Sequence, residues 1–285
     1  MPGPVQEIEL EAAPGVWRLS RADPAPDVAE FVTEYWEVEG QLGAFREALL
    51  PNGRVELMLN LGPAHRVLSE QAPGTWERAW LSGLQERALV IESLAGTHLV
   101  AARLHPLGAF ELLGSQVPGA ANSVVDLTAV MGASAHALRN VAMAASGPGD
   151  RFALLEWLLR DRVATRTAAP EFVRHSTRRI EATHGSLRVS TLHDEVAVSR
   201  KHLAVSFTRA MGLSAKAYAQ IQRFVWTLGR LQESTTIDWS KLASEAGYSD
   251  QSHLVRDFRR VGAATPTEYL RRSTPDGTAL LSEPG

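Results

Sequence analysis

The feature that most constrains this chain is an internal repeat in its last third. In VSTLHDEVAVSRKHLAVSFTRAMG (189–212), an apolar triplet spaced i, i+3, i+7 precedes a short break, and a triplet spaced i, i+4, i+7 follows it. The first triplet recurs 50 residues later and the second recurs 51 residues later, on the two sides of the break GYS (247–249). The second copy is therefore one residue longer at the turn. Such spacings put apolar residues on one helix face. Each copy is therefore predicted to be a helix-turn-helix.

Helices are also predicted around the two copies. The segment SAKAYAQIQRFVWTLGRLQES (214–234) has apolar residues at near-heptad spacing, and Ser214 is a suitable N-cap for a long connecting helix. Thr265, Pro266 and Glu268 are typical of a helix that begins with a capping box. A further helix is expected to end at Gly185. Residues 171–272 are therefore predicted to form an all-helical module.

This module is basic, whereas the rest of the chain is acidic. Residues 1–169 carry 13 Arg and no Lys against 20 Asp and Glu, while residues 170–272 carry 16 Lys and Arg against 10 Asp and Glu. The formal net charge of the whole chain is only −3. A basic module joined to an acidic one favours an anionic partner for the former, such as nucleic acid.

The second copy resembles a known family. The pattern Leu-Ala-x-x-x-Gly-Tyr-Ser-Asp-Gln-Ser-His-Leu-x-Arg-x-Phe-Arg-Arg, closed by Thr-Pro-x-x-Tyr, covers residues 242–269 and resembles the second helix-turn-helix of the AraC/XylS transcription regulators. The first copy, with Ser-Arg-Lys-His-Leu at 199–203, is similar to the first motif of that family. The resemblance covers roughly 100 residues and implies double-stranded DNA as the partner. It also implies a homodimer, and RNA polymerase as a further partner.

The resemblance implies which side chains face DNA. Recognition helices need hydrogen-bonding residues on one exposed face for base edges and basic residues beside them for phosphates. The first copy departs from the family pattern because apolar residues stand at two base-facing positions, and because its turn has Ala197 where glycine is usual. The predicted contacts are Arg200, Lys201, His202, Ala204, Val205 and Arg209 in the first copy, and Gln251, Ser252, Val255, Arg256 and Arg259 in the second.

The N-terminal part is predicted to be rich in β-structure. The alternation in GRVELMLNLG (53–62) and the apolar runs 88–94 and 98–106, separated by Pro-Gly turns, are typical of strands. The predicted fold class is α+β: an N-terminal β-sandwich or barrel, then helices, then an all-α domain with two helix-turn-helix motifs joined by a long helix. The expected segments are 1–115 (β-rich, a sensor), 116–163 (helical, with a dimerisation role), 164–170 (linker), 171–272 (DNA binding) and 273–285 (flexible tail).

A sensor role for the β-rich part comes from a second resemblance. Residues 50–62, with RLHPLG at 103–108, resemble an uncharacterised β-rich domain found in many AraC-like regulators. By analogy this part would bind a small-molecule effector or form a dimer, and Trp157 on an apolar helix stripe is predicted to lie in the core or in a dimer contact. The aromatic residues of a candidate ligand pocket are Tyr35, Trp36, Trp76 and Trp80, for which a place in the buried core is the alternative.

Other classes of function lack their residues. The chain has no cysteine, and the histidines of its β-rich part, His65, His98 and His105, show no metal-ligand spacing. No nucleotide or dinucleotide fingerprint or nucleophile elbow is present, and paired carboxylates such as Glu37 and Glu39 are predicted to form a solvated face. We therefore expect no metal, no cofactor and no enzymatic activity. With no apolar run of about 18 residues and no leader, we expect a cytoplasmic protein without membrane contact.

Two functions remain as alternatives. The first is a sequence-specific transcription regulator that binds adjacent major-groove segments through both motifs, under the control of a small effector. The second is a small-molecule-binding protein whose helix-turn-helix pair has lost specific DNA binding, which Ala204 and Val205 leave open.

Overall fold

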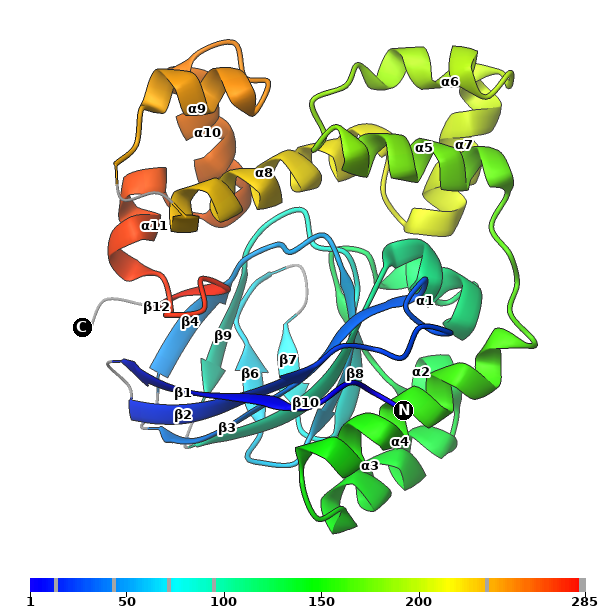
Figure 1. Ribbon diagram of the computed structural model, residues 1–285, viewed down its shortest axis with the longest axis vertical. Helices are drawn as coiled ribbons and strands as arrows, with labels where there is room; N and C mark the ends of the chain where they lie inside the picture. Colours follow the sequence, from blue (N-terminus) through cyan, green and yellow to red (C-terminus); the bar gives the residue numbers. More distant parts are fainter. Residues whose placement is uncertain (13–14, 43–44, 71–72, 94–95, 234–235, 282–285) are drawn as a thin grey trace. The chain divides into compact units, whose positions relative to one another are not determined.

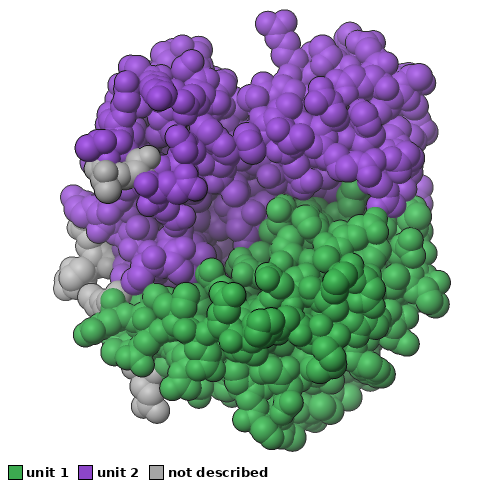
Figure 2. Space-filling model, in the orientation of Figure 1, with its two compact units in different colours: residues 1–46, 54–84, 91–168 green, residues 47–53, 85–90, 169–285 purple. Residues whose placement is uncertain are grey.

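The computed structural model describes residues 1–12, 15–42, 45–70, 73–93, 96–233 and 236–281. Contacts divide the chain into two compact units, coloured separately in Figure 2. Unit 1 comprises residues 1–46, 54–84 and 91–168, and unit 2 comprises residues 47–53, 85–90 and 169–285. Two short segments of the N-terminal half thus belong to the unit that contains the predicted helix-turn-helix motifs.

A seven-stranded antiparallel sheet forms the centre of unit 1 (Figure 1). Its register brings Tyr35, Ala102, Leu57 and Leu81 side by side on adjacent strands, and each of these residues is 0% exposed. This continuous apolar row explains why the strands assemble in this order. The strands, in spatial order, are β1 (Gln6–Ala12), β2 (Gly15–Ala22), β3 (Val32–Leu42), β10 (Thr97–Leu104), β5 (Val55–Asn60), β8 (Ala79–Ser82) and β11 (Val124–Asp126).

A smaller sheet contains five strands. Within it, His65 of one strand lies opposite Trp76 on one side and Ser93 on the other. The strands, in spatial order, are β12 (Ala279–Leu281), β4 (Phe45–Leu49), β9 (Leu89–Ser93), β6 (His65–Val67) and β7 (Gly74–Trp76).

Helices pack on the large sheet within unit 1. The helix α4 (Pro148–Val163) contacts β3 and β10, where Phe152 stacks on Tyr35 with ring centroids 6.1 Å apart. The helix α3 (Ser134–Ala144) contacts β5 and β8. The remaining elements of this group are α1 (Pro106–Leu113), the 3-10 turn η1 (Val117–Ala120) and α2 (Thr128–Met131). Trp157 of α4 is 65% exposed, so of the two predicted places for it the core is wrong, and the dimer contact stays a prediction.

The order of strands and helices differs from the prediction at two points. A helix begins at Pro106, inside the segment expected to be strands and turns, because proline suits the first helical turn and all eight residues of α1 are buried. Residues 124–126 were expected to be helical but form β11, because two valines pair with the otherwise open edge of β8.

Unit 2 consists mainly of helices. As predicted, α8 (Ala215–Glu233) is one long helix that joins two helical groups (Figure 1), and the hydroxyl of Ser214 accepts a hydrogen bond from the amide of Ala217. The predicted capping box of Thr265 and Glu268 is confirmed. The other elements are α5 (Glu171–Ala182), the 3-10 turn η2 (Val189–Thr191), α6 (Leu192–Glu195), α7 (Arg200–Met211), α9 (Trp239–Glu245), α10 (Gln251–Gly262) and α11 (Pro266–Arg272).

The C-terminal segment was expected to be a flexible tail, but its described part is structured. Residues 279–281 form β12, which pairs antiparallel with residues 47–49 of β4. The guanidinium of Arg272 donates two hydrogen bonds to the carbonyl oxygen of Leu281. The hydroxyl of Tyr269 donates a hydrogen bond to the carbonyl oxygen of Gly277. These bonds satisfy backbone groups that a free tail would leave to water. Among the described residues, no helix is both long and apolar enough to cross a bilayer.

Candidate nucleic-acid interface

The two turns of the repeat adopt the same unusual backbone geometry. Ala197, between α6 and α7, has φ 52°, and Gly247, between α9 and α10, has φ 76°. The recognition helices that follow are capped alike, because Ser199 accepts a hydrogen bond from the amide of His202 and Asp250 accepts one from the amide of His253. Each turn therefore changes the direction of the chain and is followed by a capped helix, as the repeat in the sequence predicts.

Gly247→Ala is expected to lower the free energy of unfolding of unit 2 by about 1–3 kcal/mol. The left-handed backbone disfavours a side chain there, and a Cβ atom would lie only 2.8 Å from Cβ of Ser186. Ala197→Gly is the matched reverse change and should stabilise by no more than about 1 kcal/mol. Urea unfolding followed by indole fluorescence measures both. A stabilising effect of the first change, or a large loss from the second, would contradict this reading of the turns.

The outward face of α10 carries polar and cationic side chains. Leu254 and Phe258 are 0% and 1% exposed and anchor the helix to its core. Val255 is only partly buried and packs against the same core, so it is less available than predicted. The predicted contact residues that are exposed, and whose side chains make no hydrogen bond with any described residue, are Gln251, Ser252, Arg256 and Arg259.

The buried carboxylate of Asp257 bonds α10 to Tyr248 in the turn that precedes the helix. Asp257 is 8% exposed and accepts hydrogen bonds from the hydroxyl of Tyr248 at 3.2 Å and from Arg260 Nη2 at 2.6 Å. Burial, and then the nearby Asp257 carboxylate, raise the pKa of Tyr248, so its hydroxyl stays a donor. Nδ1 of His253 lies 3.1 Å from the hydroxyl of Ser249, and its ring packs edge-on against Tyr248 at 5.2 Å. These residues therefore support the helix and leave Arg256 and Arg259 free for a partner.

The outward face of α7 is less polar. Lys201 and Arg209 are exposed and make no hydrogen bond or ion pair with the described residues, while Val205 is 60% exposed. Two residues predicted to contact DNA have partners within the protein. Arg200 Nε donates to His193 Nε2 at 2.7 Å, and the His202 ring lies 5.0 Å from that of Phe172.

The short helix α6 is held to α5 by an ion-pair cluster that the sequence did not suggest. The carboxylate of Glu195 accepts hydrogen bonds from Arg179 Nε at 2.8 Å and lies 3.1 Å from His175 Nε2. The hydrogen bonds from Arg179 and His175 lower the pKa of Glu195 to about 2. The carboxylate therefore stays charged at any physiological pH, and it fixes a helix of only four residues.

Comparison with known families agrees with this geometry. Residues 192–272 match the model of a helix-turn-helix domain, and residues 20–126 match a domain of unknown function, DUF6597. Residues 192–272 thus form an AraC-type helix-turn-helix domain, which follows an N-terminal domain of the DUF6597 type. No curated protein sequence matches the chain.

Solved structures of AraC-type proteins show the fold. ToxT from Vibrio cholerae matches with a TM-score of 0.50 and 9% identity, covering 83% of this chain and 98% of ToxT. The wild-type ToxT bound to an unsaturated fatty acid (TM-score 0.46, 11% identity, 83% and 94% covered) and the AraC-like transcriptional activator CuxR (0.34, 14%, 74% and 80%) match less closely. The predicted α+β class, a β-rich part followed by helices, is confirmed.

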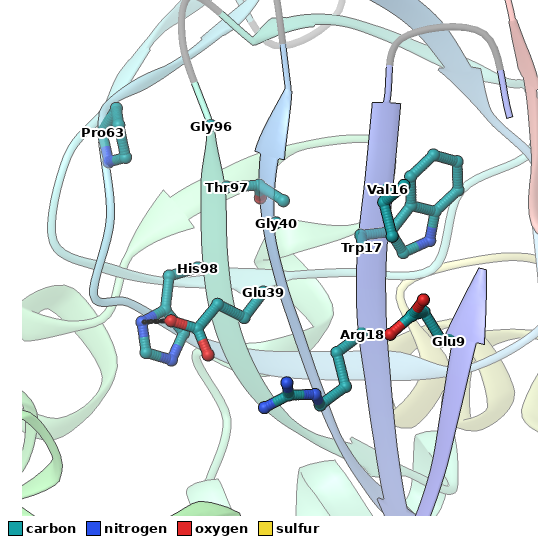
Figure 3. A pocket seen from close by; sticks show the side chains of 10 residues that line it. All are labelled: Glu9, Val16, Trp17, Arg18, Glu39, Gly40, Pro63, Gly96, Thr97 and His98. Atoms are coloured by element: carbon teal, nitrogen blue, oxygen red, sulfur yellow. Dashed lines mark ion pairs between the residues drawn. The ribbon is translucent and has the colours of Figure 1, made fainter. Parts of the chain in front are cut away.

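The N-terminal unit contains an open pocket of about 650 Å³ (Figure 3). Its residues Glu9, Arg18, Glu39 and His98 are neighbours on four adjacent strands, so acidic and basic side chains alternate along the row. The other lining residues are Val16, Trp17, Gly40, Pro63, Gly96 and Thr97, so none of the four predicted ligand aromatics lines this pocket.

Two residues that line the pocket, Glu39 and His98, also belong to a group of side chains that could hold a cation, but the guanidinium of Arg151 is bound to the third member, Glu37. Ligand atoms of Glu37, Glu39 and His98 lie within 4.8 Å of one another. However, Arg151 of α4 donates hydrogen bonds at 2.7 Å to both carboxylate oxygens of Glu37. A metal ion would have to displace this guanidinium, so the donor set fits an ion pair better. Glu37 is 3% exposed, and the prediction that it lies on a solvated face is wrong.

The four predicted ligand aromatics do not form one group. Tyr35 and Trp36 are consecutive in β3 and therefore point to opposite faces of the sheet. Tyr35 packs on α4, whereas Trp36 lies under the guanidinium of Arg103 at 5.9 Å. Trp76 and Trp80 do come together, with ring centroids 6.3 Å apart, and the His65 ring lies 6.2 Å from that of Trp80. Sequence reasoning missed His65.

Proposed function

We propose that this AraC-type protein is a sequence-specific DNA-binding transcription regulator that presents α7 and α10 to adjacent segments of the major groove. The observation that carries the proposal is the exposed face of α10 with Gln251, Arg256 and Arg259. Glutamine can pair with adenine and arginine with guanine, while further arginines bind phosphates. The support beneath this face by Asp257 and Tyr248 keeps the helix rigid enough to read bases.

The first motif complements the second. A helix of 19 residues such as α8 spans about 28 Å, which is about 6–8 Å less than the distance of about 34–36 Å between successive major-groove faces, and the motifs at its two ends extend that reach. On α7, Lys201 and Arg209 suit phosphates or guanine, and the exposed methyl groups of Ala204 and Val205 suit a thymine methyl. We expect α10 to contribute more to base discrimination than α7.

Arg256→Ala is expected to weaken binding to the cognate site by about 1–3 kcal/mol, roughly 5- to 150-fold, and to relax the preference at one base position. The side chain is exposed and has no hydrogen-bonding partner among the described residues, so the fold should be unaffected. Sites selected from a random DNA pool, followed by titration, measure affinity and specificity together. Arg78→Ala removes an exposed arginine of unit 1 and is the matched control. Equal affinities and identical selected sites for the two variants would contradict the assignment.

The second candidate function is a small-molecule-binding protein that no longer binds specific DNA. The apolar face of α7, with Val205 60% exposed, favours it. A salt titration distinguishes the two, because the affinity for DNA falls more steeply with salt the more phosphates the protein neutralises. A steep slope together with a selected consensus supports the regulator, whereas weak binding without a consensus supports the alternative.

Control by a small effector is part of the proposal. Nε2 of His65, which is 3% exposed, and Nε1 of Trp76 are buried and make no hydrogen bond with the described residues, and both lie beside Trp80. An uncharged molecule with a flat apolar part and one hydrogen-bonding oxygen would suit this cluster. Quenching of indole fluorescence across a panel of such molecules tests it. By the family resemblance we further propose a homodimer, which light scattering tests, and RNA polymerase as a partner in the cytoplasm.

A further inference from the structure

The hydrophobic core beneath the second motif includes residues from the N-terminal half of the chain. Leu50 and Ala88 are 8% and 7% exposed, and they belong to the same buried cluster as Leu254, Phe258 and Val261 of α10. The segments that carry them, 47–53 and 85–90, are part of unit 2 (Figure 2). The second motif is therefore not completed by residues after 169 alone.

Backbone hydrogen bonds join these segments to the end of α10 and to the chain beyond it. The amide of Ala88 donates to the carbonyl oxygen of Val261 at 2.8 Å, one of the carbonyls that a helix leaves unpaired in its last turn. The amide of Leu50 donates to the carbonyl oxygen of Thr278 at 2.9 Å, next to the pairing of β12 with residues 47–49. Both N-terminal segments thus contact the helix end or the strand that follows it.

A glycine at the end of α10 shows how tight the packing is. A Cβ atom on Gly262 would lie 2.9 Å from Cζ of Phe224 and 3.5 Å from Cδ2 of Leu50. The last turn of α10 therefore sits between α8 on one side and Leu50 on another, with no room for a methyl group. Small movements of Leu50 would be transmitted to the helix, because packed cores respond by repacking and not by gradual deformation.

In the first motif, the described contacts of the large buried aromatic side chains are with residues of the same helices. Its large buried residues come from α5 to α8, and Phe207 packs on Tyr218, whose hydroxyl donates to Glu181 at 2.6 Å. The anchor of α6, Glu195, is also bound by residues of α5. Buried residues of this motif include Val173, Ile180, Leu192, Leu203, Phe207 and Tyr218.

We propose that Leu50 and Ala88 are positioning residues for the second recognition helix, through which the N-terminal half controls α10 and not α7. The segment 47–53 continues β4, and the segment 85–90 leads into β9, so both are covalently continuous with strands of the β-rich part. A change in those strands would reach α10 through the Val261 and Thr278 hydrogen bonds. This inference rests on the proposed DNA-binding function for its consequence, but the positioning itself is independent of DNA.

The test uses the full-length protein and compares Leu50→Ala with Leu203→Ala, which removes the equivalent volume from the core under α7. Hydrogen–deuterium exchange measured by mass spectrometry reports on the two recognition helices separately. Leu50→Ala should speed exchange in α10 by about tenfold or more and leave α7 unchanged, and Leu203→Ala should do the reverse. Leu50→Met, which conserves volume, should behave like the wild-type protein. Leu50→Val gives the same sign at smaller amplitude if the alanine variant does not fold.

Hydroxyl-radical footprinting on a selected site then tests the consequence. Leu50→Ala should lose protection at the half contacted by α10 and retain it at the half contacted by α7, a pattern that general destabilisation would not produce. Unchanged α10 exchange, or equal loss in both helices or at both halves of the site, would overturn the inference. If the wild-type protein protects no DNA, the proposed function fails, and the exchange experiment still decides whether Leu50 positions α10.

Discussion

Arg151→Ala is expected to lower the free energy of unfolding of the β-rich unit by about 3–5 kcal/mol. The guanidinium donates two hydrogen bonds of 2.7 Å to the carboxylate of Glu37, and the two residues are 8% and 3% exposed. Among the described residues, removing the arginine leaves this buried carboxylate with His98 Nε2, at 3.0 Å, as its remaining side-chain partner. Uncompensated buried charge is among the few causes of losses this large.

The pKa of Glu37 predicts a second measurable effect of the same substitution, a change in how stability depends on pH. Burial on its own would raise the pKa of this carboxyl, but hydrogen bonds from His98 and Arg151 outweigh burial and lower it. A lowered pKa means that the ion pair stabilises the fold above the ordinary pKa of a glutamate, about 4.3, and that this contribution is lost as the pH falls below it. Without Arg151 the pKa should rise above its ordinary value, so the variant should be least stable near neutral pH.

The measurement is urea unfolding of the wild-type and variant proteins at neutral pH. Arg162→Ala removes a partly exposed arginine from the same helix and should cost less than about 1 kcal/mol. Replacing both partners, in Glu37→Leu with Arg151→Leu, should restore most of the loss, because a well-packed apolar pair is often as stable as a buried ion pair. A loss below about 1 kcal/mol for Arg151→Ala would show that water reaches Glu37.

The predictions that succeeded depend on residues close together in the sequence. The caps of α7 and α10 join residues three apart, and the capping box of Thr265 does the same. The left-handed turn residue is fixed by the geometry of two adjacent helices, so the repeat in the sequence located Ala197 and Gly247 correctly. Helical periodicity likewise separated Leu254 and Phe258 from the exposed face of α10.

The predictions that failed depend on distant pairings. Glu37 and Glu39 alternate with apolar residues along β3, which is typical of a strand with one exposed face, yet the partner of Glu37, Arg151, lies 114 residues further along. The two valines of β11 show no strand pattern in the sequence, and they form a strand because they pair with the edge of β8. Residues 279–281 likewise form a strand because they pair with β4. Leu50 and Ala88 show the same limit, because nothing local links them to Val261.

The ligand aromatics show a different limit. Composition picks out Tyr35, Trp36, Trp76 and Trp80 as large and aromatic, but it does not reveal which face of a strand each one occupies. Alternation along β3 separates the first two, and only the register of β6 with β7 brings His65 opposite Trp76. A correct strand register would have predicted the His65 cluster; residue type alone could not.

His65 is the basis of the second large effect, a loss of stability in mild acid. Burial lowers the pKa of His65 to about 4, against an ordinary value of about 6.5 in an unfolded chain. Between these values the unfolded state binds the proton and the folded state does not, so stability falls as the pH is lowered. The full contribution is present above about pH 6.5 and is lost as the pH falls to about 4. A difference of about 2.5 pH units corresponds to an upper bound of about 3 kcal/mol.

His65→Gln should remove this pH dependence while leaving an amide that can still bond to the hydroxyl of Ser93, which now lies 2.9 Å from His65 Nδ1. Urea unfolding at several pH values between 4.5 and 7.5 measures it, with indole fluorescence as the signal because Trp80 lies beside the ring. His136→Gln changes an exposed histidine of the same unit and should leave the slope as it is in the wild-type protein. The comparison is between slopes, so any constant cost of the glutamine cancels. Parallel curves for the wild-type protein and His65→Gln would mean that the imidazole is protonated in the folded state at the same pH as in the unfolded chain. The buried, uncharged cluster proposed for the effector would then be excluded as well, because both conclusions require an imidazole that stays neutral beside Trp76 and Trp80.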